Sequence, residues 1–177
     1  ATAEIYAQRV SGAGALLGSN FNVSTDGVFS GYPAVAWGEA GNQFLVAWDN
    51  DDGNIHGRRI DAATGNLLGS AIHVTSGGAK DRSAIAYDSV KERWLVQYND
   101  GSHAGFSYDQ YGRLVTPDGA SSGDPVPIAH SPGFEGDTQF GGDVTFAPAA
   151  ERFFSSYGTD TGMGGQESFS TGEPVGP

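Results

Sequence analysis

The chain has 177 residues, enough for one domain with a sizeable core, and its 21 acidic and 9 basic side chains give a formal charge of −12. This balance argues against nucleic acid, whose phosphates demand a basic surface, and against simple electrostatic attachment to anionic membranes. Cysteine is absent, which excludes a disulfide framework and thiolate chemistry. No apolar run approaches the roughly 20 residues that cross a bilayer, so no membrane span is expected. The chain begins at Ala1 without an initiator Met, and we expect either a trimmed piece or a processed, mature product.

Short apolar or alternating segments follow one another along the chain, separated by Gly, Asn and Asp. The first two, at 5–10 and 21–25, read Ile-Tyr-Ala-Gln-Arg-Val and Phe-Asn-Val-Ser-Thr. Segments of four to six residues between such turns predict antiparallel strands joined by hairpins. Further segments of this kind lie at 34–37, 44–48, 55–60, 72–76, 84–87, 94–98, 103–108, 126–130, 143–146, 153–157 and 165–169.

The segments repeat at a step of about fifty residues. Trp48 and Tyr98 are 50 positions apart, whereas Tyr98 and Tyr157 are 59 apart, so the third unit carries an insertion that we place in 116–132. No stretch has a convincing 3.6-residue apolar period, and almost no helix is expected. Four-strand units at this period are typical of a β-propeller. The predicted fold class is therefore all-β, with antiparallel four-stranded repeats in a β-propeller-like arrangement.

The predicted organisation is one β-repeat domain with uneven ends. It comprises a half unit at 1–31, a unit at 32–80, a unit with the insertion at 81–133 and a partial unit at 134–177. The two ends together could make one split blade, which gives about three blades per chain. Because propellers typically have about 4 to 8 blades, we expect other copies of the chain or other chains to complete the array. A sandwich or an open stack of the same strands is the alternative.

The segments 5–10 and 21–25 resemble a repeat of large secreted bacterial proteins. That repeat, found in the repeats-in-toxin and hemolysin-type calcium-binding class, reads IYAQRFDA…FQVNT…FVVTW. The segments 44–48 and 55–62 match the same plan, while the third unit matches in part and the last poorly. The resemblance implies a β-propeller-like fold and a secreted or cell-surface location in bacteria, and it implies no catalytic residue. The glycine-rich calcium nonapeptide of those toxins is absent.

One acidic loop is the candidate metal site. Asp49, Asp51 and Asp52 precede Gly53, and clustered carboxylates in a loop bent by Gly suit calcium. The alternative is a solvated hairpin turn, since no Glu closes the loop at the required distance. The histidines show no metal-ligand spacing and are expected to be exposed strand residues; they are His56, His73, His103 and His130.

Aromatic and acidic residues give two further candidates. Trp37, Trp48 and Trp94, with Arg58 nearby, are candidate sugar ligands, because an aromatic face can stack on a pyranose. The alternative is that these rings fill the space between blades. A second acidic cluster could act on a sugar by acid–base chemistry or could be a charged loop, and it contains Glu135, Asp137 and Asp143.

Two functional classes follow from these observations. The first is an extracellular, non-enzymatic binding or structural module used for adhesion, surface assembly or carbohydrate binding, with a glycan as ligand and calcium as its cofactor. The alternative is an accessory or processed fragment of a secreted enzyme, such as a glycoside hydrolase or a protease.

Overall fold

The computed structural model describes residues 2–102, 108–129, 140–159 and 162–169. Within these residues it contains thirteen strands in four antiparallel sheets and a single 3-10 turn, η1 (Pro148–Ala150). None of the described segments forms a helix of the length and apolarity that a bilayer span requires. The prediction of an all-β fold with almost no helix is confirmed.

Each sheet is a meander in which strands that follow one another in sequence pair antiparallel, as short connections favour. The first sheet has two strands, the next two sheets have four strands each, and the last has three, so the predicted half and partial units have two and three strands. The strands are β1 (Tyr6–Val10) and β2 (Leu16–Asn22); β3 (Ser30–Gly38), β4 (Gln43–Asn50), β5 (Ile55–Asp61) and β6 (Leu67–His73); β7 (Lys80–Asp88), β8 (Arg93–Asp100), β9 (Asp109–Val115) and β10 (Ser121–Ala129); and β11 (Phe140–Ala147), β12 (Arg152–Thr159) and β13 (Gly162–Phe169).

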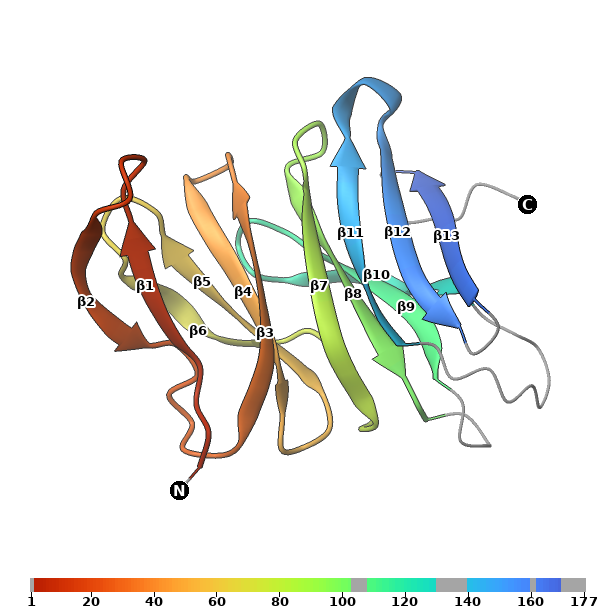
Figure 1. Ribbon diagram of the computed structural model, residues 1–177, viewed down its shortest axis with the longest axis horizontal. Coiled ribbons are helices and arrows are strands. Elements are labelled where there is room, and N and C mark those ends of the chain that lie inside the picture. Colours follow the sequence, from red (N-terminus) through yellow and green to blue (C-terminus); the bar gives the residue numbers. More distant parts are fainter. Residues whose placement is uncertain (1, 103–107, 130–139, 160–161, 170–177) are drawn as a thin grey trace.

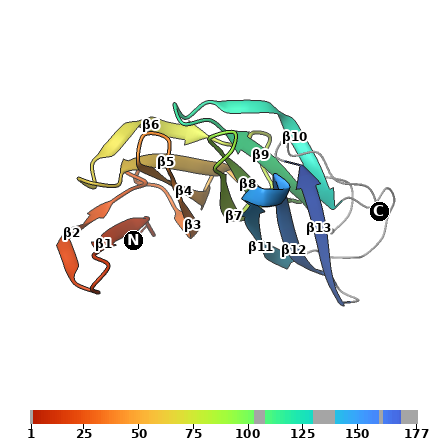
Figure 2. The ribbon, with the colours of Figure 1, turned by 90° about the horizontal axis from the view of Figure 1, so that it is seen from above.

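The four sheets stand side by side in a row (Figure 1). Seen from above, the row is an arc, with β6 and β10 on its outer rim and β3, β7 and β11 next to one another on the opposite side (Figure 2). This arrangement is β-propeller-like, as predicted, but the arc is not closed. The sheets β1–β2 and β11–β13 lie at opposite ends of the row, so the predicted split blade does not form within one chain (Figure 1).

The predicted position of the third strand in the third sheet was wrong. We expected it at 103–108, of which 103–107 lie outside the described residues, and Tyr108 is not in a strand. The strand is β9, and Trp94 pairs with Val115, whereas in the second sheet Phe44 pairs with Ile60. The separations are 21 and 16 residues, so five extra residues precede β9. Five of the nine extra residues of the third unit therefore precede the predicted range 116–132, and the other four follow Val115.

The last strands of the first three sheets begin earlier than predicted. β2, β6 and β10 start at Leu16, Leu67 and Ser121, where alternation is weak and glycine is frequent. Their C-terminal ends overlap the predicted segments. Register shifts in all three pairings with their neighbouring strands explain why a simple period of two did not mark them.

The core consists of three apolar seams, each between two neighbouring sheets. The first seam contains Trp48 with Val23 and Val46, and the second contains Trp94 with Leu45 and Val96. The third joins Leu95 to Val144 and Phe153. Each sheet thus buries one face on the sheet before it and the other on the sheet after it. β4 and β8 are buried almost throughout because both of their faces lie in seams.

Two sheet faces break this rule and leave apolar residues open: the side of the second sheet that faces β1 and β2, and the outer side of the last sheet. Val35 on β3 is 63% exposed, although Ile85 in the matched position of β7 is only 8% exposed. At the other end Phe154 on β12 is 47% exposed, although the matched Leu95 on β8 is 1% exposed. We call these the N-face and the C-face of the array. The N-face is only partly covered, because the sheet beside it has two strands and not four, and the C-face is not covered by another of the four described sheets.

Candidate functional site

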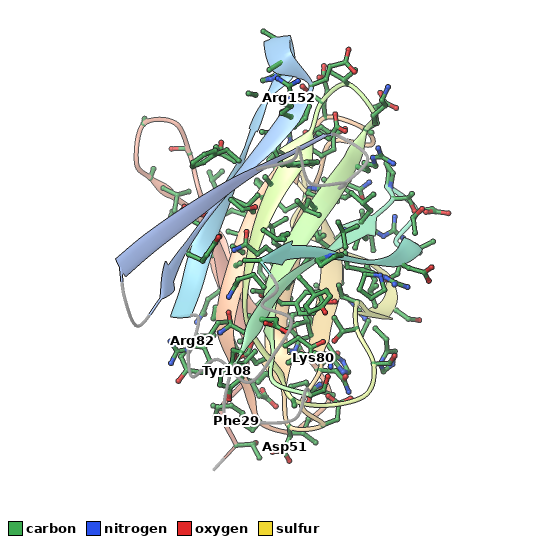
Figure 3. The ribbon with its side chains drawn as sticks, turned by 90° about the vertical axis from the view of Figure 1, so that its right-hand side faces the viewer. Phe29, Asp51, Lys80, Arg82, Tyr108 and Arg152 are labelled. Atoms are coloured by element: carbon green, nitrogen blue, oxygen red, sulfur yellow. The ribbon has the colours of Figure 1, made fainter. Side chains whose placement is uncertain are left out.

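Buried polar side chains gather where β3 and β7 begin and β4 and β8 end. We call this the polar end of the molecule. Lys80, Arg82 and Asp51 all lie toward it, whereas Arg152 lies at the opposite end (Figure 3). Buried polar groups are costly unless they are bonded, so their concentration at one end marks a candidate site. The buried polar residues at this end are Ser30, Asp49, Asn50, His56, Lys80, Asn99, Asp100, Asp109 and Gln110.

Asp49 joins the second sheet to the third. It lies at the end of β4 with 7% of its surface exposed, and its Oδ1 accepts the backbone N–H of Arg82 at 2.8 Å. Burial raises the pKa of Asp49 to about 6, and the charge of Asp81 adds to this, while the Arg82 N–H opposes it. Asp49 is therefore a carboxyl group that can exchange a proton near neutral pH.

The charge of Asp81 lies close enough to raise the pKa of Asp49. The Asp81 carboxylate is held by hydrogen bonds that run through three side-chain amides. Its Oδ1 accepts Asn99 Nδ2 at 2.8 Å, and Asn99 Oδ1 accepts Gln110 Nε2. Gln110 Oε1 in turn accepts Gln97 Nε2 at 3.0 Å, so the chain of amides ends in the buried interior of the third sheet. Each of these hydrogen bonds restricts the orientation of the amides that it joins, although Gln97 Oε1 accepts no hydrogen bond.

Tyr32 and Arg82 place an exposed ring and a cation beside these carboxyl groups. Both have left-handed backbones, with φ of 48° and 53°, at the register shifts near the starts of β3 and β7. The Arg82 guanidinium carbon lies 5.9 Å from the centre of the Tyr32 ring, within range of a cation–π interaction. Tyr32 is 62% exposed. A non-Gly residue at positive φ is uncommon, and two matched ones mark a built feature.

A buried ion pair stabilises the same end. Lys80 Nζ lies 2.9 Å from Asp100 Oδ1, and it also donates to the Gly78 carbonyl at 2.7 Å. Burial raises the pKa of Asp100, but hydrogen bonds from Ser102 and Lys80 outweigh it and leave the pKa below its usual value. This pair ties the start of β7 to the end of β8.

The three carboxylates of the predicted calcium loop do not converge. Asp49 contacts the Arg82 backbone, Asp52 contacts His56 at 3.0 Å, and Asp51 is exposed. Their oxygens are not grouped within reach of one ion. Calcium binding by this loop stays a prediction, and the geometry gives it no shared set of ligands.

The loop joins a different group, which the sequence reasoning missed. Asp52, His56 and His73 place one potential ligand atom each within 4.8 Å of one another. His56 is buried, which corrects the expectation that it is exposed, while His73 is exposed. The two rings meet edge to face with centroids 4.5 Å apart, because His56 on β5 pairs with His73 on β6. The pairing of β5 with β6 was the signal that could have brought the two histidines together in a prediction. The other two histidines, His103 and His130, lie outside the described residues.

The predicted sugar ligands are not brought together. Trp48 and Trp94 are fully buried in the first and second seams, so the alternative that they fill the space between blades is correct for both. Trp37 is 48% exposed on the N-face and donates through Nε1 to Asn42 at 3.1 Å. Arg58 is half-buried in the middle of β5. Neighbouring Arg59 bonds the Pro117 carbonyl at 2.7 Å, which links two sheets.

The second acidic cluster is only partly described. Asp143 is exposed on β11, whereas Glu135 and Asp137 lie outside the described residues.

Comparison with solved structures identifies proteins of similar fold. An N-acetylgalactosamine deacetylase from F. plautii, solved with blood group B trisaccharide, superposes with a TM-score of 0.58 at 12% identity, over 84% of this chain and 52% of that one. A thermostable family-43 glycoside hydrolase has a TM-score of 0.58 at 15% identity, over 96% of this chain and 70% of that one. The chain thus spans about half of the first protein's length. No protein-family model and no curated protein sequence matches it.

Proposed function

We propose that the chain is a carbohydrate-active β-propeller module of glycoside hydrolase type, with its sugar site at the polar end. The observation that carries this proposal is the pair Asp49 and Asp81, two carboxyl groups in different surroundings at the open ends of neighbouring strands. The carbohydrate-active neighbours favour this reading over a purely structural role. An extracellular location is part of the proposal, because carbohydrate polymers are substrates that such a module meets outside the cell.

The chemistry of the polar end fits a sugar. Asp49 has a pKa near neutrality and can hold or give a proton, while Asp81 offers a hydrogen-bonded carboxylate. Two such carboxyl groups are what hydrolysis of a glycosidic bond requires, one as acid and one as base or nucleophile. The exposed Tyr32 ring offers an apolar surface beside them. Sugar hydroxyl groups can bond bidentately to carboxylate and amide groups that are already held in place.

The experiment compares Asp49→Asn and Asp81→Asn with the matched control Asp51→Asn, which changes an exposed carboxylate in the adjoining turn. Cleavage of a panel of p-nitrophenyl pentosides and hexosides is measured with binding to a glycan array that includes blood group B trisaccharide. The unmodified chain is expected to cleave or bind at least one of these sugars. Its activity is expected to be at least tenfold weaker in Asp49→Asn and in Asp81→Asn, and unchanged in Asp51→Asn. Repeating the array with a chelator tests calcium. A folded chain that neither binds nor cleaves any sugar of the panels overturns the proposal.

A second role, assembly into a larger array, is favoured by the two open faces. We propose that a second copy covers the N-face with its C-face. Leu45 of the second sheet is in the position of Phe154, and Ile85 of the third sheet is in the position of Val35. These two residues belong to the same seam, so inside the row a face of the Phe154 kind packs on a face of the Val35 kind. β1 and β2 cover only the outer half of the N-face, and the inner half lines an apolar groove of about 430 Å³ that includes Val35 and Phe44.

This contact joins two different faces, so two variants that each lose one face can still associate with each other. The mass in solution is measured for the chain, for Val35→Asp, for Phe154→Asp and for an equal mixture of both. The chain is expected to be oligomeric and each variant weakened, while the mixture regains association because each variant keeps one intact face. Val90→Asp, at an exposed apolar residue of the β7–β8 turn, is the control. A monomeric chain, or a mixture no better than either variant, contradicts the proposal.

A further inference from the structure

We propose that Asp52, His56 and His73 form a binding site for a divalent transition metal of the zinc type, made of other residues than the Asp49–Asp81 pair. Two imidazoles and a carboxylate are ligands that zinc prefers, whereas calcium takes oxygen ligands. Their ligand atoms lie within 4.8 Å of one another, and His56 Nε2 lies 3.0 Å from Asp52 Oδ2. Ligands of a tetrahedral zinc at about 2.1 Å lie about 3.4 Å apart, so small side-chain rotations suffice.

Strand pairing holds the two histidines, and the turn brings the carboxylate to them. His56 and His73 are directly opposite each other on β5 and β6, so their side chains share a face of the sheet. Asp52 lies in the β4–β5 hairpin, where it also accepts the backbone N–H of Asn54 at 3.0 Å.

The fold itself does not require these residues. The position of the His56–His73 pair is taken by Tyr6 and Asn22 in the first sheet, and by Tyr111 and Pro127 in the third. Fifty positions after Asp52 the third sheet has Ser102. Among the described residues, three metal-ligating side chains meet only in the second sheet. Matched strands fold with other residues at these places, so packing does not explain the set.

The surroundings suit an exchangeable metal. His56 is buried and fixed, while the Asp52 side chain is 46% exposed and His73 faces solvent, so an ion can enter from one side. Three protein ligands leave a fourth position for water. Asn50 Nδ2 lies 3.2 Å from His56 Nδ1. This contact outside the ligand set helps to fix the His56 ring.

The test titrates the chelator-stripped full chain with zinc in competition with a chromophoric chelator. We expect one zinc per chain, with affinity at least tenfold weaker in His73→Gln and in Asp52→Asn. Asp51→Asn is the matched control, because it removes the adjacent carboxylate and leaves the ligand set intact. A His103→Asn/His130→Asn variant is expected to bind like the unmodified chain.

A second readout tests the geometry. Cobalt(II) in place of zinc is expected to give the intense visible absorption of a four-coordinate ion, and His73→Gln is expected to lose it. His73 is exposed, so its replacement leaves the core unchanged. Absence of saturable zinc binding, or equal affinities for His73→Gln and Asp51→Asn, overturns the proposal.

Discussion

The indole of Trp94 occupies the space that a side chain on Gly38 would need. A Cβ at Gly38 would lie 2.9 Å from Trp94 Cε2 and equally close to Tyr87 Cε2, well inside van der Waals contact. Gly38 ends β3 in the second sheet, and Trp94 belongs to β8 in the third. The second seam closes because one sheet has no side chain where the next has its largest ring.

Replacing Gly38 by Ala tests this relationship. We expect the free energy of unfolding to fall by about 1–3 kcal/mol, because the ring must move within a packed seam. Gly12→Ala is the control, since a Cβ there meets nothing within 4 Å and its φ is not in the left-handed region. Urea denaturation of both variants measures the difference. Equal stabilities would show that the seam adapts without cost.

Trp94 and Trp37 should differ sharply when replaced. Trp94→Ala is expected to cost about 3–5 kcal/mol, because a fully buried ring leaves a cavity. Trp37→Ala should cost about 1 kcal/mol or less, since its ring is half exposed. Thermal unfolding followed by circular dichroism measures both. A large loss for Trp37→Ala would mean that another chain already covers the N-face.

The Lys80–Asp100 pair should matter far more than an exposed pair. Lys80→Met leaves a buried carboxylate without its cation and is expected to cost about 3–5 kcal/mol. Lys91→Met is the control, because Lys91 and Glu151 are about half exposed and 3.7 Å apart; it should change stability by about 0.5 kcal/mol or less. Chemical denaturation at pH 7 compares them, and similar losses would contradict the assigned role of burial.

Asp49 should make stability depend on pH in a defined direction. Its folded pKa of about 6 is above the ordinary 3.8, so the folded state holds the proton more tightly and stability falls as pH rises from about 4 to 6. Asp49→Asn keeps an oxygen acceptor for the Arg82 N–H but has no charge. After discounting for solvent screening, we expect it to gain on the order of 1–2 kcal/mol relative to the unmodified chain between pH 4 and 7.

Denaturation curves at pH 4, 5, 6 and 7 measure this difference. An Asp49→Asn variant whose relative stability does not change with pH would place the proton on another group.

The sequence predicts the first two strands of the second, third and fourth sheets well, because their apolar residues recur at matched positions. It fails for β9, since five extra residues shift Tyr111 and Arg113 away from the fifty-residue step set by His56 and Arg58. The tripeptides His56-Gly-Arg and Tyr111-Gly-Arg would have aligned these strands. Predicting the histidine group requires the pairing of β5 with β6, which is interrupted by a register shift. The Asp49–Arg82 contact joins residues 33 positions apart in different sheets, which no local pattern reports.

The three tryptophans are separate optical reporters, two of them in seams. Trp48 lies in the first seam, Trp94 in the second, and Trp37 on the open N-face. In a linear array stability is roughly a sum of neighbour contacts, so the ends can open before the middle. Variants that keep a single tryptophan would follow each boundary by fluorescence, and acrylamide quenching of Trp37 alone would signal the arrival of a covering partner.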